Sequence, residues 1–349
     1  MGNEKVDFDR SFFQPLIKFG KKVLKHKVIS LLLLLCIMIA IFSFWSASVG
    51  NRFFHITTLR NTMNSLVLPA FLTIGTGCLL LSGNLDLSMS SIGAFGGVVI
   101  ALSLKVLEYP LWISIILTLL SCAVFGVLNG VLVNVFRFPA FIATLAMASV
   151  AKGIMYFISA WGGGGSSNNV TFNDAGMKYL GRGEPISGVQ IGVIILIAFF
   201  IIYGIIVSKT RFGMKAVLVG GNQKAARLAG INSKPVIYIL FINSAIMGGI
   251  AGIFNAARIN QGALAALQIN QFTGLTAALI GGISFGGGAG GMGGAFVGLL
   301  ILNTFQLGMS TIGADPFWVQ VFTGLLLLIA LTVDFINQER LARAALKAV

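Results

Sequence analysis

Long apolar stretches, separated by short polar segments, occupy the chain from about residue 28 to residue 336. The first runs from Val28 to about Val49 and is long enough to cross a bilayer as a helix. The later stretches predict helices near 60–81, 88–104, 111–134, 139–160, 187–207, 236–257, 272–285, 293–312 and 316–335. The pattern therefore predicts an all-α, polytopic membrane protein with about ten transmembrane helices.

The polar segments divide the chain into regions. Residues 1–27 form a basic N-terminal segment, residues 28–336 form the transmembrane region, and residues 337–349 form a C-terminal tail. We interpret the first apolar run as an uncleaved helix and not as a signal peptide, because it has full bilayer length and further spans follow. Segment 161–187 is rich in Gly, Ser and Asn, which predicts a flexible loop. Segment 281–294 is so rich in glycine that broken or re-entrant helices are an alternative to full spans there.

The composition agrees with a membrane protein, because 56% of the residues are hydrophobic and only 10% are charged. The net charge of +14 does not indicate a nucleic-acid partner, since the basic residues are spread over loops and no nucleic-acid motif occurs. In a ten-span topology with the N-terminus inside, seventeen Lys and Arg residues fall in cytoplasmic segments and six fall outside. This asymmetry predicts that both termini and the loop 208–235 are cytoplasmic, and that 161–187 is external.

No motif for covalent chemistry is present. The chain lacks a Walker A sequence, HExxH and GxSxG, and its three cysteines lie in apolar spans without metal-ligand spacing. We therefore expect no catalytic residue, no metal site and no cofactor bound by this chain.

The cytoplasmic loop 208–235 carries six basic residues and no acid. Within it, Asn222 is a suitable N-cap, an alanine-rich stretch favours a short helix, and Gly230 is suited to end that helix in the left-handed conformation. A short helix with a small apolar face is suited to docking on a partner, and we expect Ala226 to present that face. The alternative is a basic loop that only fixes topology.

The same loop resembles the coupling loop of sugar-type ABC importer permeases of the ribose/galactose branch, whose pattern is T-x-F/Y-G-x-x-x-x-A-x-G-G-N-x-E-A-A-x-x-x-G-I. The matching positions are Thr210, Phe212, Gly213, Gly220, Gly221, Asn222, Ala225, Ala226, Gly230 and Ile231. Lys224 departs from it, because it replaces the usual Glu. Two further stretches, SGNLDLSMSS at 82–91 and GGISFGGGAG at 281–290, resemble the family motifs G-x-D-L-S-V-G-S and G-G-x-S-x-x-G-G-x-G.

The resemblance implies a permease subunit of a bacterial plasma (inner) membrane importer for a sugar or related small polar solute. It implies a cytoplasmic ATPase that binds the ATP, an extracytoplasmic solute-binding protein, and a second permease chain, identical or related. It assigns the contact with the ATPase to the coupling loop, with Gly221, Asn222, Lys224, Ala225, Ala226, Arg227 and Gly230 as the candidate residues.

Candidates for the substrate pathway are Asn84, Asp86, Asn255, Arg258 and Gln271. A buried acid in a membrane protein is often functional, but Asp86 has the alternative role of capping the helix that begins near Leu87. The family usually has Y-E-L-D ahead of its glycine-rich segment, and here Gln271 and Thr273 replace the acids. Neutral amides in this region suit a polyhydroxylated solute, contact with a binding protein, or solvation of a loop.

Two other functions compete with the sugar importer. A permease for nucleosides or other polar solutes has the same architecture. An ion-coupled secondary transporter usually keeps ionisable groups in its spans, and here only Lys152, Asp86 and Asp334 are available. A membrane-embedded enzyme would need a catalytic constellation, which the sequence lacks.

Overall fold

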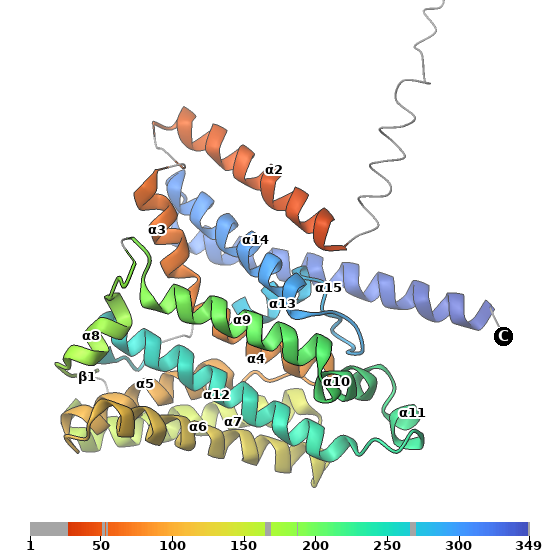
Figure 1. Cartoon of the computed structure of the whole chain (residues 1–349), viewed down its shortest axis with the longest axis horizontal. Helices are drawn as coiled ribbons and strands as arrows, with labels where there is room; N and C mark the ends of the chain where they lie inside the picture. The colour runs from red at the N-terminus through yellow and green to blue at the C-terminus, as the bar shows by residue number, and fades with distance from the viewer. Residues whose placement is uncertain are drawn as a thin grey trace, which may run out of the picture.

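The computed structural model describes residues 27–50, 53, 55–164, 169–186, 188–265 and 270–347. All of the basic segment 1–27 except Lys27 lies outside the described residues, as do the last two residues of the tail. Helices make up most of the described chain, which confirms the all-α class. Figure 1 shows them packed as a bundle of roughly aligned rods.

Eight helical stretches in the described part of the chain are long and apolar enough to cross a membrane. They are α2 (Lys27–Ser48), the α3–α4 pair (Ile56–Ser65 and Val67–Leu81), α6 (Leu111–Asn134), α7 (Ala140–Ser159), α9 (Ile191–Lys209), α12 (Ser233–Ile259), α14 (Met292–Thr311) and α15 (Pro316–Lys347). A shorter apolar helix, α5 (Met89–Lys105), has 17 residues. The polytopic architecture is thus confirmed, and the expected number of about ten is approximate.

The predicted span at 272–285 is instead the eight-residue helix α13 (Thr273–Ile280). At 1.5 Å per residue, α13 covers about 12 Å of a hydrocarbon layer of roughly 30 Å. The reason lies in the glycines that follow, because Gly282, Gly287, Gly288 and Gly290 have positive φ angles that a continuing helix excludes. The broken helix, considered as an alternative from the sequence, is the structure found.

Helix α12 lies at the centre of the bundle and packs against α4, α5 and α6. Its Phe254 stacks on Phe71 of α4 with ring centroids 5.3 Å apart, and Phe199 of α9 meets Phe71 edge-on. Gly126 lets α6 approach closely, since a Cβ at that position would lie 2.6 Å from the Cα atom of Ile242 on α12. Small residues at such crossings are typical of helix packing in membranes.

The two ends of the bundle differ. At one end, on the right of Figure 1, lie the start of α2, the helices α10 (Arg211–Gly221) and α11 (Gln223–Leu228), and the end of α15. At the other end lie α8 (Ala175–Arg182) and the strand β1 (Val170–Thr171). We refer to these as the α11 end and the α8 end.

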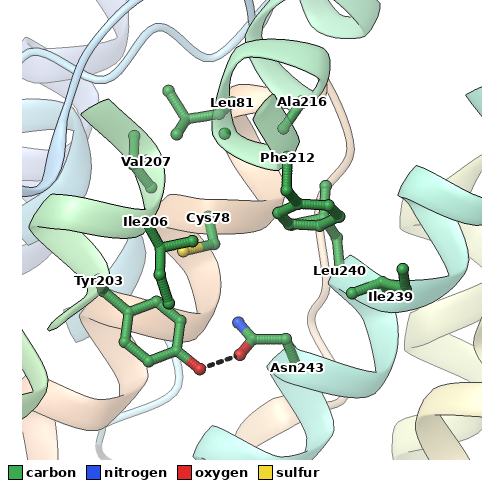
Figure 2. A pocket seen from close by; sticks show the side chains of 11 residues that line it. Cys78, Leu81, Tyr203, Ile206, Val207, Phe212, Ala216, Ile239, Leu240 and Asn243 are labelled. Carbon is green, nitrogen blue, oxygen red and sulfur yellow. Dashed lines mark hydrogen bonds between the residues drawn. The ribbon is translucent and has the colours of Figure 1, made fainter. Parts of the chain in front are cut away.

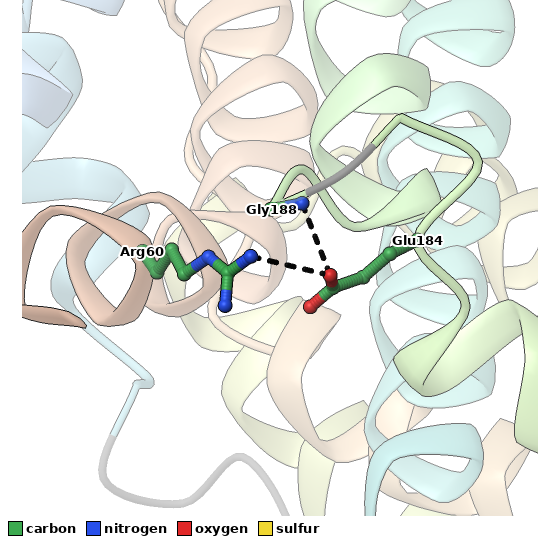
Figure 3. A network of polar contacts seen from close by, with 3 residues as sticks. All are labelled: Arg60, Glu184 and Gly188. Carbon is green, nitrogen blue, oxygen red and sulfur yellow. Dashed lines mark hydrogen bonds and ion pairs between the residues drawn. The ribbon is translucent and has the colours of Figure 1, made fainter. Parts of the chain in front are cut away.

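The segment 161–187 is structured over its described residues and is not simply the flexible loop expected from its composition. A π-helical turn, Ala160–Gly164, is followed by β1, which pairs antiparallel with β2 (Gln261–Gly262), and then by α8. Asn169 accepts a hydrogen bond from the amide of Leu264 at 3.0 Å. Figure 3 shows Glu184 between the guanidinium of Arg60 at 3.5 Å and the amide of Gly188 at 3.0 Å. The partners of this segment lie far away in the sequence, so its composition did not reveal them.

The helix that contains the last predicted span runs on past residue 336. Helix α15 ends at Lys347, so most of the tail 337–349 prolongs it, and the cytoplasmic position of this tail stays a prediction. An ion pair between Glu339 and Arg343, four residues apart at 2.9 Å, supports this extension.

Candidate functional site

Helix α11 forms where the capping signals predicted it. The Oδ1 atom of Asn222 accepts a hydrogen bond from the amide of Ala225 at 3.0 Å, and Gly230 has a φ angle of +79°. The amide of Ile231 donates to the carbonyl of Ala226 at 2.9 Å, which completes a glycine-terminated helix end. The short helix and both of its ends are therefore confirmed.

The orientation of α11 differs from the expectation for Ala226. Ala226 is only 5% exposed and belongs to the main hydrophobic core, so it faces the body of the protein and not a partner. Leu228 is 91% exposed, and its neighbours Lys224, Ala225 and Arg227 are also exposed. Ala226 belongs to the same core cluster as Val219 of α10 and Ile237 of α12, and Leu228, two residues further along the helix, is turned outward. The apolar contact offered by this loop is thus Leu228.

A basic cleft lies beside α11 and has a volume of about 880 Å³. It lies between the α6–α7 turn and the segment from the end of α10 to the start of α12. Four cations line it: Arg137, Lys224, Arg227 and Lys234. No acidic residue lines it. Asn84, predicted for the substrate pathway, lines this cleft and donates to the carbonyl of Ser82 at 3.2 Å. Asn84 therefore lies next to the α10–α11 loop.

Three segments meet at a contact made almost entirely of glycine, which we call the glycine junction. It consists of Gly83 after α4, Gly220 and Gly221 at the end of α10, and Gly287 and Gly288 in the turn between α13 and α14. The amide of Gly288 donates to the carbonyl of Leu81 at 3.0 Å. A Cβ on Gly220 would lie 2.0 Å from that carbonyl oxygen, so no larger residue fits. The junction joins the α10–α11 loop directly to two transmembrane segments.

The glycine-rich turn is also held from α15. Asp334 accepts hydrogen bonds from the amide of Phe285 at 2.9 Å and from the hydroxyl of Ser284 at 3.3 Å. Gln338 donates to Asp334 at 2.6 Å and to Ser284 at 2.8 Å. Asp334 is therefore engaged in fixing this turn, which gives an intramembrane acid a structural role.

A cavity of about 220 Å³ lies under α10, between α4, α9 and α12 (Figure 2). Its lining is apolar except for the thiol of Cys78 and for Tyr203 and Asn243, and the hydroxyl of Tyr203 donates to the Oδ1 atom of Asn243. Cys78 of α4 and Ala216 of α10 both line it. Incomplete packing beneath α10 lowers the cost of moving α10 relative to α4.

Asp86 lies in the segment between α4 and α5 and is buried. Its Oδ1 atom accepts from the amide of Ser88 at 2.8 Å and from the hydroxyl of Ser88 at 2.5 Å, and its Oδ2 atom accepts from Ser244 of α12 at 2.7 Å. Asn129 of α6 donates to Ser88 at 2.9 Å. The N-cap of α5 is Ser88, so Asp86 stands two residues before the cap and is not the cap itself. Its contacts tie the segment to α6 and α12.

The predicted pathway residues do not form one site. Asp86 contacts α12 at Ser244, and Asn255 and Arg258 lie 11 and 14 residues further along that helix, or about 16 and 21 Å. The backbone carbonyl of Arg258 accepts two hydrogen bonds from Arg182 of α8 at 2.8 and 3.0 Å. Gln271 lies just before α13 and is half-buried. Asn84 and Asp86 thus lie towards the α11 end, and Asn255 and Arg258 towards the α8 end.

Sequence reasoning missed a second cavity, at the end of the bundle opposite α11. It lies between α14 and α15, has a volume of about 380 Å³, and is lined in part by Asn270, Gln306 and Gln320. Asn270 is adjacent in sequence to the predicted candidate Gln271, and the other two amides lie in apolar helices. The i, i+4 spacing of Gln306 and Ser310 gave a weak signal that the apolar background of α14 obscured.

An apolar helical bundle with a capped basic loop at one end and a neutral polar cavity at the other defines a membrane transport permease. Residues 52–331 match the family described as branched-chain amino acid transport system / permease component, and the chain belongs to this permease family.

Curated relatives agree with that assignment. The L-arabinose transport system permease protein AraH of Escherichia coli (strain K12) is 31% identical over 260 residues, which cover 74% of this chain and 77% of the relative. The ribose import permease protein RbsC of the same strain is 29% identical over 305 residues, 87% of this chain and 92% of the relative. The fructose import permease protein FrcC of Rhizobium meliloti is 27% identical over 288 residues, 82% and 80% of the two chains. No solved structure gives a significant match.

Proposed function

We propose that this chain is the transmembrane subunit of an ATP-driven ABC importer for a sugar or related small polar solute. A separate cytoplasmic ATPase binds the ATP, and an extracytoplasmic binding protein delivers the solute. Support comes from the relatives, whose names describe permeases for arabinose, ribose and fructose. In this proposal the chain itself carries out no covalent chemistry.

The observation that carries the proposal is the exposed face of α11. Leu228 is 91% exposed on a helix in which Ala226 packs inward and Ala225 is exposed, and four cations line the cleft beside this helix. An exposed apolar side chain next to a basic cleft fits a partner with an apolar pocket and acidic rim. We assign this partner surface to the ATPase.

We further propose that the chain works as a pair in the bacterial plasma membrane, with a second copy or a related permease. The transmembrane stretch of α15 has no buried residue within one chain, so its surface is available to lipid and to a second chain. The start of α2, α11 and the end of α15 lie at one end of the bundle. This arrangement supports the proposal that both termini are cytoplasmic, on the same side as the basic loop.

A second candidate is the import of branched-chain amino acids, because the description of the matched family names that transport system. Such a solute carries a carboxylate and an ammonium group, which require charged or strongly polar partners. An ion-coupled transporter is less well supported, since Asp86 and Asp334 are both occupied by hydrogen bonds that hold the fold.

Reconstitution tests the proposal. The chain is co-expressed with its ATPase and its binding protein and placed in liposomes loaded with ATP. We expect uptake of a radiolabelled sugar from a panel of L-arabinose, D-ribose and D-fructose, and we expect it to stop without the ATPase. Uptake by this chain alone, driven by a proton or sodium gradient, would refute the proposal.

The docking face is tested in the same system with Leu228→Glu, and Leu228→Met serves as the volume-matched control. An unpaired carboxylate buried at the contact costs several kcal/mol, about enough to dissociate a modest interface. We expect the Glu variant to lose copurification with the ATPase while its membrane insertion is unchanged, and the Met variant to retain both. Equal retention by the two variants would place the ATPase elsewhere.

A further inference from the structure

The cavity between α14 and α15 has the size and the polar lining of a small-molecule binding site. It has a volume of about 380 Å³, within the range of small-molecule sites, and lies at the far end of the bundle from α11. Helix α14 contributes Gln306 and Ser310, which are one helical turn apart. Helix α15 contributes Phe317, Gln320 and Thr323, which are spaced three residues apart and line the same cavity. Asn270, just before α13, completes the lining.

The polar groups in this cavity are all neutral, and most have hydrogen-bonding capacity to spare. The Nε2 atom of Gln306 donates to the hydroxyl of Thr323 at 3.3 Å. In the part of the chain that the structure describes, the side chains of Asn270, Ser310 and Gln320 make no hydrogen bond. An amide that faces hydrocarbon without a hydrogen-bond partner costs free energy. This cavity therefore favours water or a polar ligand over an acyl chain.

We propose that the α14–α15 cavity is a binding subsite for a neutral, polyhydroxylated solute on the outer side of the permease. This inference rests on the proposed function and adds a location and a solute class to it. The amides of Asn270 and Gln320 and the hydroxyl of Ser310 offer both donors and acceptors, which is what a sugar's hydroxyl groups require. The exposed ring of Phe317 provides an apolar surface for the C–H face of a sugar ring.

The absence of charge from this lining discriminates against an amino acid. No Lys, Arg, Asp or Glu lines the cavity, so the carboxylate and ammonium groups of a zwitterion would lose water without gaining a charged partner. A neutral polyol loses only hydroxyl hydration, which the amides replace. The lining of this cavity therefore favours a sugar over a branched-chain amino acid, the two solute classes that the names of the relatives and of the matched family suggest.

Transport kinetics test the proposal. In the reconstituted importer, Gln320→Leu and Ser310→Ala remove hydrogen-bonding groups from the cavity, and Thr332→Val removes an exposed hydroxyl of α15 outside it. Loss of one neutral hydrogen bond corresponds to about a 2–10-fold change in affinity. We expect an increase of that size in the apparent KM for the imported sugar in both cavity variants, with the maximal rate and copurification of the ATPase unchanged. Thr332→Val should match the wild type.

A labelling experiment tests binding directly, because a purely structural role of Ser310 would not make labelling at this position sensitive to sugar. Ser310→Cys is introduced with Cys36, the exposed native thiol, replaced by Ser. A membrane-impermeant maleimide should label Cys at 310, and the imported sugar should slow labelling while L-leucine should not. Equal protection by leucine, or unchanged KM values with no protection by sugar, would overturn the subsite. If the wild-type complex imports no sugar at all, the proposed function fails first, and that result is recognised before any variant is compared.

Discussion

Replacing Gly220 with Ala tests whether the glycine junction connects the α10–α11 loop, the proposed ATPase contact, to the membrane helices. The added Cβ would lie 2.0 Å from the carbonyl oxygen of Leu81 and 2.8 Å from the amide nitrogen of Gly288. To restore a normal contact, α10 must move away from α4 by roughly 1 Å or more. That movement disrupts the 3.0 Å hydrogen bond between Gly288 and Leu81.

The energetic cost is the sum of two effects. Overpacking costs about 1–3 kcal/mol, and a buried backbone group left without its hydrogen bond costs about another 1–3 kcal/mol. The higher helix propensity of Ala returns about 1 kcal/mol. The variant is therefore expected to be less stable by about 1–5 kcal/mol. Gly221→Ala is a suitable control, because its Cβ would lie 3.6 Å from Gly288, an ordinary contact.

Two assays on the detergent-purified importer decide the matter. Thermal unfolding followed by a thiol-reactive dye should show a lower Tm for Gly220→Ala and an unchanged or higher Tm for Gly221→Ala. Sugar-stimulated ATP hydrolysis and uptake should be uncoupled only in the Gly220 variant. If both variants unfold at the same temperature and transport alike, the junction neither holds the loop closely nor transmits its movement.

Three further predictions concern other parts of the chain. Lys224→Glu should weaken retention of the ATPase several-fold at low salt and little at high salt, and replacing a facing acid on the ATPase with a base should restore retention. Retention that does not depend on salt would contradict this prediction. Asp86→Ala, which leaves Ser88 and Ser244 without their acceptor, should lower Tm strongly, whereas Asp86→Asn should preserve both Tm and uptake; loss of uptake in a stable Asn variant would instead assign the charge to transport. Gly294→Ala should destabilise the protein because its Cβ would lie 2.2 Å from the carbonyl oxygen of Gly281, and Gly293→Ala, with open space around it, should not; a reversed order would refute the α13–α14 packing.

The fold could be predicted where the signal is local. The helix expected at 111–134 is α6 with the same bounds, because an uninterrupted apolar stretch and the proline before it define both ends. The caps of α11 were predictable for the same reason, since Asn222 and Gly230 act on their immediate neighbours. By contrast, α13 ends after eight residues because of glycines whose φ angles the hydropathy pattern does not encode.

The candidate site depended on longer-range packing and was predicted only in part. A helix of six residues is too short for periodicity to show which side faces inward, so Ala226 and Leu228 were indistinguishable until the core was known. Asp86 accepts a hydrogen bond from Ser244, which lies 158 positions away in the sequence, and no local pattern identifies that partner. The cavity between α14 and α15 depends on how the two helices face each other, which apolar stretches leave open.

Helix α14 connects the glycine junction at the α10–α11 loop to the proposed solute subsite. It begins four residues after Gly288 of the glycine junction and carries Gln306 and Ser310 into the cavity at its other end. Its twenty residues span about 30 Å as one rigid element. A movement of α10 that shifts Gly288 therefore displaces the start of α14, and rigid helices pass such displacements along their axes. Close packing of Gly294 on Gly281 makes α13 move with it. For this reason Gly220→Ala, about one membrane thickness away from the subsite, is expected to alter the protection of a thiol at position 310 by sugar, while Gly221→Ala leaves it unchanged.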